Sequence, residues 1–194
     1  MNPNQLLNQI LPILHSVKED GKKLQQILDF LLEEIYEEPN ETVVIPERHR
    51  ELVRRIAENI DCGLVCFVNP DTFEMEDVPG MMVNDPHEYR MLTGMSGKDL
   101  NLHHKKWEKC ITVEPPESSE SFGIMESFID EVDDNNLTKR LINALSNRKP
   151  FANFKGLVES SNYRAQWFAF KQRKLEEYVW ENLINENFSL NQED

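Results

Sequence analysis

The sequence predicts an α+β protein that is mostly helical, with a small antiparallel sheet of about three strands, a C-terminal helical layer and an N-terminal helical hairpin. Apolar residues recur at helical spacing over 1–37 and again over 118–186. Between these stretches, residues 63–79 hold two β-branched and aromatic runs around a turn, and 109–114 forms a third such run. We therefore expect helices towards both ends of the chain and a sheet in its middle.

The first part of the chain, residues 1–40, is expected to be a helical hairpin extension. Two helices are separated by a break near Asp20–Gly21, and Pro39–Asn40 marks the end of the extension. The second helix, Leu24–Ile35, carries an apolar stripe that needs a covering surface. The stripe either packs against the rest of the same chain or forms a homodimer through the Leu24–Ile35 helix.

The middle of the chain alternates helix and strand. We expect a helix over 46–61, then the β-hairpin with its turn at 70–72. Asp85 has the position of an N-cap ahead of a proline, and Gly94 that of a helix stop, so a short helix is expected between them. Residues 93–106 are expected to be loop, and the third strand follows this loop.

Helical periodicity dominates the chain after the paired prolines that end the third strand. Helices are expected over 118–132, 135–145, 151–158 and 162–186. Together with the sheet they make a single α+β domain over 41–187, and the polar tail 188–194 is expected to be disordered.

Composition restricts the compartment and the ligand. The formal net charge is -14, which argues against nonspecific nucleic-acid binding by the whole surface. Three cysteines do not form a disulfide framework and indicate a reducing cytoplasm. No basic region precedes the first apolar residues, and no run approaches the ~20 apolar residues of a membrane span. We therefore expect a cytoplasmic protein that has no membrane partner.

Charge is distributed unevenly near the carboxyl end. Residues 114–134 hold eight carboxylates and no Lys or Arg, whereas 139–174 holds nine cations and one carboxylate. Such neighbours are expected to attract each other, so that the acidic helix folds against the basic ones. Alternatively, the basic segment is a docking surface for an anionic partner.

Cations alternate with aromatic residues in this basic segment, which makes it the candidate binding surface. Cations interleaved with rings on one helix face suit stacking and phosphate contact. The candidate residues are Arg148, Lys149, Lys155, Arg164, Trp167, Lys171 and Lys174. The sequence predicts a noncatalytic interaction protein whose partner is another protein or an anionic macromolecule. RNA or single-stranded nucleic acid on the same surface is the alternative.

Metal and catalytic sites are weaker candidates. Cys62 and Cys66 with His103 and His104 do not match a zinc site, because the adjacent histidines point apart. The sequence contains no nucleophile elbow, phosphate-binding glycine loop or H-E-x-x-H motif. We therefore predict no metal, no cofactor and no catalytic residue. A small hydrolase or transferase using residues 87–110 is the alternative from a different class.

Aromatic residues at fixed separations carry a resemblance to a known family. They are found in the segments Met125–Ile129, Arg148–Lys155, Trp167–Phe170 and at Trp180. Over 110–186 the chain resembles Uncharacterised Protein Family 0158, and its family-like helical part spans 114–186. The upstream hairpin is similar, but Thr72–Phe73 stands where the usual turn is Thr-Gly. The resemblance implies a compact bacterial α+β domain and implies no activity.

Overall fold

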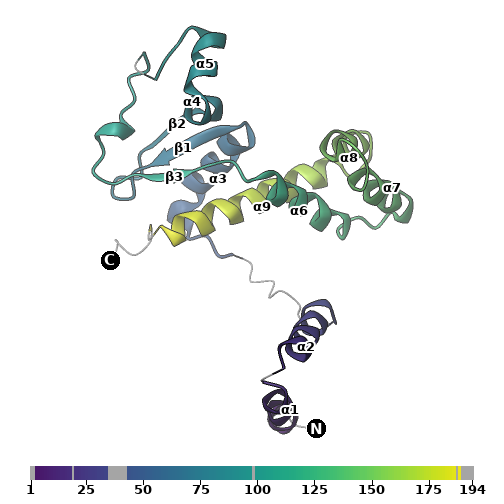
Figure 1. The fold of residues 1–194 in the computed structure, drawn as a ribbon. Helices are drawn as coiled ribbons and strands as arrows, with labels where there is room; N and C mark the ends of the chain where they lie inside the picture. The colour runs from purple at the N-terminus through teal and green to yellow at the C-terminus, as the bar shows by residue number, and fades with distance from the viewer. Residues whose placement is uncertain (1–2, 19, 35–42, 98, 187, 189–194) are drawn as a thin grey trace. The chain divides into compact units, whose positions relative to one another are not determined.

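The α+β class is confirmed by a computed structural model of the chain (Figure 1). The structure describes residues 3–18, 20–34, 43–97, 99–186 and 188. It divides into two compact units, Met1–Val44 and Ile45–Asp194. The predicted boundary at residue 40 lies within the undescribed segment 35–42.

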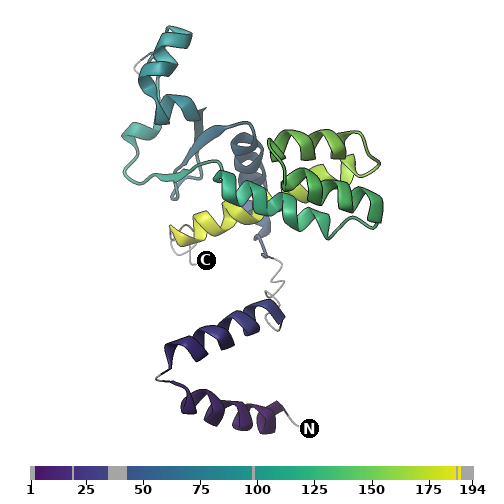
Figure 2. The same cartoon turned by 45° about the vertical axis from the view of Figure 1, so that its right-hand side comes forward.

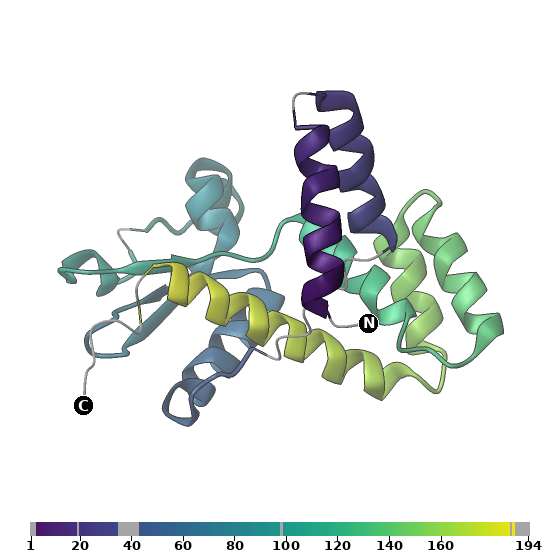
Figure 3. The same cartoon turned by 90° about the horizontal axis from the view of Figure 1, so that it is seen from below.

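The smaller unit contains helices α1, Pro3–Ser16, and α2, Gly21–Glu34, which run antiparallel in Figures 2 and 3. Apolar side chains on both helices are exposed to solvent, among them Ile13, Leu28 and Phe30. Two helices of this length have too little interior to bury all of their apolar residues. Ile35, the last residue of the predicted apolar stripe, lies outside the described residues.

The sheet forms the predicted hairpin and third strand, in the order β2-β1-β3. Strand β1, Leu64–Val68, pairs antiparallel with β2, Met75–Pro79, and with β3, Ile111–Val113. The turn between β1 and β2 is organised by Asn69, whose Oδ1 accepts a hydrogen bond from the Asp71 amide at 2.9 Å. Because β1 is the central strand, it pairs with both β2, which follows it directly, and β3, which comes later in the chain.

Phe73 closes this turn in a left-handed backbone conformation, with φ of 59°. A non-glycine residue there costs about 1–2 kcal/mol, because its Cβ atom lies too close to the following carbonyl oxygen. In this chain the Phe73 ring lies 5.1 Å from the His49 ring and 5.3 Å from the Phe188 ring, between centroids. This aromatic packing offsets the backbone strain.

Helix α3, Glu47–Asp61, covers the sheet and buries Val53 and Ile56 as predicted. Helix α5, Pro86–Thr93, begins where expected, because the Asp85 side chain accepts a hydrogen bond from the Glu88 amide at 2.8 Å. The sequence did not predict two short elements. These are α4, Gly80–Asn84, and the 3₁₀-helix η1, His104–Lys106, which lies in the expected loop.

The C-terminal helical layer contains the four predicted helices. They are α6, Ser118–Ile129; α7, Asn135–Leu145; α8, Pro150–Glu159; and α9, Arg164–Asn185. Helix α9 contacts α3 and β3 as well as α6 and α8, so it joins the sheet to the helical layer (Figures 1 and 3). In the described part of the chain, no helix combines the length and apolarity of a membrane span.

Phe188 is the one described residue of the segment 188–194, for which disorder was predicted. Its side chain is only 2% exposed and its ring lies 5.1 Å from the ring of His49, between centroids. We call His49, Phe73, Trp180 and Phe188 the His49 cluster. Burying an aromatic ring contributes about 1.5–3 kcal/mol, which favours this placement of Phe188. Residues 189–194 lie outside the described residues.

Candidate functional site

A groove between the end of α3, the β3–α6 connection and the helices α6, α8 and α9 contains part of the predicted binding surface. Its volume is about 440 Å³. Most of its lining is apolar, and we name it the aromatic groove. Its lining residues are Ile60, Asp61, Gly63, Pro115, Pro116, Ser121, Ile124, Met125, Phe151, Phe154, Lys155, Trp167, Phe168, Lys171 and Leu175. Three of the seven predicted residues, Lys155, Trp167 and Lys171, are therefore brought together here.

Helical spacing places the side chains of the groove. On α9, Phe168, Lys171 and Leu175 follow one another at intervals of three and four residues, so they share one face. On α8, Phe151 and Lys155 are one turn apart. Phe151 and Phe168 are unusually exposed for phenylalanine side chains, at 43% and 40%. The rim of the groove therefore offers two rings to solvent.

The two lysines of the groove already have carboxylate neighbours. Lys171 pairs with Asp61 of α3, and both side chains are about one-third exposed. Lys155 Nζ lies 3.8 Å from a carboxylate oxygen of Glu159, and the Lys155 side chain is 69% exposed. Exposed pairs of this kind contribute only about 0–1 kcal/mol, so a carboxylate of a ligand can compete for Lys155.

Trp167 is buried, whereas an open stacking surface requires an exposed ring. Its side chain is 7% exposed, and its ring centroid lies 5.0 Å from those of both Phe128 and Phe154. Trp167 therefore forms a wall of the groove and part of the core. The exposed ring on this helix is Phe168, and the guanidinium carbon of Arg164 lies 4.9 Å from the centroid of that ring. The sequence feature that could have identified Phe168 as the exposed ring is its position four residues after Arg164, where the two side chains are neighbours on a helix.

Arg148, Lys149 and Lys174 do not line the aromatic groove. Arg148 and Lys149 are exposed in the connection between α7 and α8. Lys174 Nζ donates to Glu177 one turn further along α9, at 2.8 Å. The seven residues thus belong to several surfaces.

Helix α6 packs against α9, as the sequence predicted for the acidic segment, but the contact is mainly aromatic. The Phe128 ring of α6 lies 5.0 Å from Trp167 and 5.4 Å from Phe170 of α9, between centroids. Across the described residues, one ion pair joins 114–134 to 139–174, between Arg173 and Glu131 at 3.9 Å. Apolar burial, and not charge attraction, therefore determines how these helices pack.

Residues 87–110 contain a second polar cluster. His104 Nδ1 contacts a carboxylate oxygen of Glu76, and the amides of His103 and His104 donate to the same carboxylate at 2.9 and 3.0 Å. Burial raises the pKa of Glu76, but these hydrogen bonds outweigh it and the pKa is lowered overall. The His104 ring also stacks on Phe67, with 3.9 Å between centroids. These contacts hold Glu76 ionised and fix the loop to β2.

Among the described residues, no hydroxyl or thiol side chain is hydrogen-bonded to these histidines. In the described part of the chain, the side-chain hydrogen bonds of His103 and His104 go to Asn101 and Glu76 and to no Ser, Thr or Cys. Burial raises the pKa of Cys110, and it raises that of Cys66 to about 12. Both thiols are therefore poor nucleophiles at neutral pH. Among the described residues, no group of His, Cys, Asp and Glu has a metal-binding arrangement.

Comparison with known proteins gives one family model and one curated relative that match this chain. The model of Uncharacterised protein family UPF0158 matches residues 98–194. A UPF0158 protein of Pseudomonas aeruginosa is 32% identical over 73 residues, which is 37% of this chain and 48% of that protein. The chain thus spans about half the length of the curated relative that it matches. No solved structure matches. The family match covers α6–α9 and most of the aromatic groove, and the chain belongs to Uncharacterised protein family UPF0158.

Proposed function

We propose that this protein is a noncatalytic interaction protein of the cytoplasm that binds a partner protein through the aromatic groove. The observation that carries the proposal is the pair of exposed rings, Phe151 and Phe168, at the rim of a concave apolar site. Aromatic side chains in such sites are typical anchors of protein interfaces. The segment of the partner that fills the groove would present apolar side chains to its lining and a carboxylate to Lys155. Three free thiols agree with a reducing compartment.

Single-stranded nucleic acid is the second candidate ligand of the same surface. It is favoured by Arg164, which lies over the exposed ring of Phe168. A base can stack on such a ring while the guanidinium contacts phosphate. The two candidates differ in their response to salt, because phosphate binding weakens steeply as the salt concentration rises. The hydrolase or transferase alternative has less support, because no nucleophile contacts His103 or His104 among the described residues.

Photo-crosslinking in bacterial cells tests the proposed site. A benzoylphenylalanine at position 168 should form a covalent adduct with a protein. The same residue at position 184 is the control, because Ile184 lies on the same helix and is 43% exposed but does not line the groove. Adducts that nuclease removes would identify nucleic acid as the ligand. Equal protein adducts at both positions would contradict the proposal.

A charge variant extends this test to Lys155. We expect Lys155→Glu to reduce the adduct at position 168 by about tenfold, because a partner carboxylate would then meet a like charge. Lys139→Glu makes the same change of charge on α7, outside the groove, and should leave the adduct unchanged. An adduct that survives Lys155→Glu would remove the proposed role of charge.

A homodimer through α2 is our proposal for assembly. Leu28, a residue of the predicted apolar stripe, is 48% exposed on this helix, and two such stripes can cover each other. Light scattering of the full chain should give a dimer, and Leu28→Glu should give a monomer because it places a charge in the shared apolar face. Gln26→Glu, at an exposed polar position of the same helix, is the control and should stay dimeric. A monomeric wild-type chain would contradict this assembly.

A further inference from the structure

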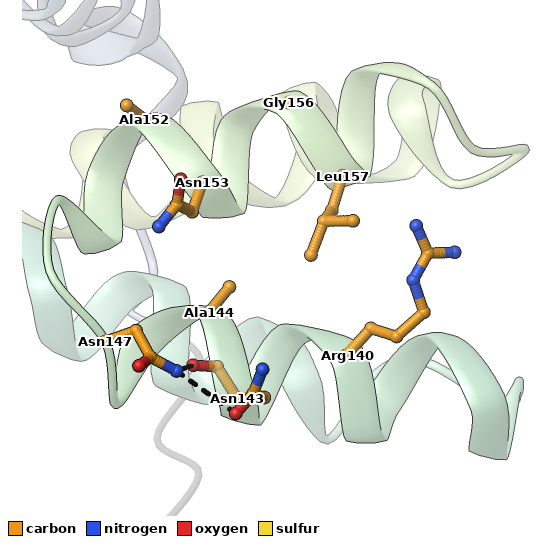
Figure 4. A pocket seen from close by; sticks show the side chains of 8 residues that line it. All are labelled: Arg140, Asn143, Ala144, Asn147, Ala152, Asn153, Gly156 and Leu157. Carbon is orange, nitrogen blue, oxygen red and sulfur yellow. Dashed lines mark hydrogen bonds between the residues drawn. The ribbon is translucent and has the colours of Figure 1, made fainter.

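A second groove runs between α7 and α8, and amide side chains line much of it (Figure 4). Its volume is about 650 Å³. Figure 4 shows Asn153 and Leu157 of α8 directed towards α7, with Arg140 of α7 beside Leu157. The lining residues are Arg140, Asn143, Ala144, Asn147, Ala152, Asn153, Gly156 and Leu157. We name this surface the amide groove.

Cations without a carboxylate neighbour lie at the amide groove and in the adjacent turn between α7 and α8. In the described part of the chain, Lys155, Lys171, Arg173 and Lys174 each lie within 4 Å of a carboxylate. On the α7–α8 hairpin the situation is the opposite, since no described carboxylate pairs with Arg140, Arg148 or Lys149. In a chain of net charge -14, such a group of unpaired cations indicates an anionic ligand.

Gly156 lies inside α8, where glycine costs about 1 kcal/mol relative to alanine. Neither usual reason for a glycine applies here. Its φ is not positive, and a Cβ atom added to it would meet nothing within 4 Å. Gly156 does line the amide groove, together with Ala152 on the same helix. A bare backbone at this point allows a ligand to approach closely.

The free hydrogen-bonding groups of the asparagines distinguish between anionic ligands. Asn147 Nδ2 donates to Asn143 Oδ1 at 3.1 Å, and Asn153 Nδ2 donates to the Arg148 carbonyl at 2.8 Å. The Oδ1 acceptors of Asn147 and Asn153 and the Nδ2 donor of Asn143 make no hydrogen bond within the described residues. A peptide backbone offers both N–H and C=O groups to such a set. A phosphodiester backbone offers only acceptors, and no aromatic ring lines the groove for base stacking.

We propose that the amide groove binds an extended, acidic peptide segment of another protein. The asparagines hydrogen-bond to its backbone, Gly156 and Ala152 allow that backbone to approach α8, and Arg140 contacts its carboxylates. The turn residues Arg148 and Lys149 extend the positive surface beyond the asparagine end of the groove. This site is separate from the aromatic groove, which shares none of these lining residues.

A fluorescein-labelled peptide of repeating Asp-Ala dipeptides is the probe, with a labelled oligothymidylate of similar length as the competing ligand class. Anisotropy with the full chain should show binding of the peptide. Arg140→Glu should weaken it by about tenfold or more. Lys139→Glu is the matched control, since it makes the same charge change at the adjacent position, which does not line the groove. It should change the affinity by less than about threefold.

Gly156→Leu separates binding from folding. The added side chain meets no protein atom near its Cβ, and it replaces a poor helix former, so the melting temperature should stay equal or rise. Peptide affinity should nevertheless fall by about tenfold, because the side chain fills the groove. The proposal is overturned if the peptide does not bind, if all variants bind it equally, or if oligothymidylate binds more tightly than the peptide. Phe168→Ala, in the aromatic groove, should not affect the peptide.

Discussion

Phe128→Ala should lower the free energy of unfolding by about 3–5 kcal/mol, because it removes the ring that joins α6 to α8 and α9. Phe128 is fully buried, and its ring contacts those of Phe154, Trp167 and Phe170 at 5.0 to 6.3 Å between centroids. A loss of this size is a large fraction of the ~5–15 kcal/mol that stabilises a typical domain. Urea denaturation followed by circular dichroism measures it.

Glu131→Gln is the control that separates ring packing from charge. It removes the ion pair with Arg173, whose atoms are 3.9 Å apart and whose side chains are about half exposed. We expect a change within about 0.5 kcal/mol. If Glu131→Gln proved as costly as Phe128→Ala, charge attraction between the acidic and basic segments would organise the helical layer after all.

Phe188→Ala should lower the free energy of unfolding by about 3 kcal/mol, because it removes a buried ring. Its ring packs against Phe73, Trp180 and His49. Thermal unfolding measures the loss, and Ile184→Ala on exposed α9 surface should change stability by less than about 0.5 kcal/mol. An unchanged melting temperature for Phe188→Ala would mean that the ring does not anchor the chain end.

The same variant should alter the pH dependence of stability. Burial lowers the pKa of His49 below its ordinary 6.5, and the neighbouring Arg48 guanidinium lowers it further. Above that ordinary value both folded and unfolded chains carry neutral His49. As the pH falls through it, the unfolded chain takes up a proton that the folded chain does not, so stability decreases. Phe188→Ala admits water to His49, so stability should fall less between about pH 7.5 and 5.5 than in the wild type. A steeper fall would contradict this.

Local signals in the sequence were sufficient to predict most of the helices and strands. Asp85 and Gly94 gave both ends of α5, and the β-branched runs around the Asn69 turn gave β1 and β2. Helix α4 was missed because Gly80–Asn84 is one turn long and has no periodic face. Phe188 was missed because its partners, His49 and Phe73, are distant in sequence. Such contacts leave no periodic pattern.

The candidate site was only partly predictable for a similar reason. Helical spacing places Arg164, Phe168 and Lys171 on one face, but it does not say which aromatic residue of α9 turns inwards. Trp167 is buried because α6 and α8 both supply rings to it, Phe128 and Phe154. The amide groove depends on two helices meeting, so asparagines that look unremarkable in the sequence become neighbours only in the fold.

Hydrogen exchange of the full chain, with and without the protein captured at position 168, tests most directly whether the aromatic groove is the partner-binding site. The most informative segment runs from the connection after β3, where Pro115 and Pro116 line the groove, into the start of α6, where Ser121 lines it. Bound partner should slow exchange at residues 117–125 and leave α5 unchanged. Slower exchange confined to α4 and α5, with residues 117–125 unaffected, would contradict the aromatic groove as the site.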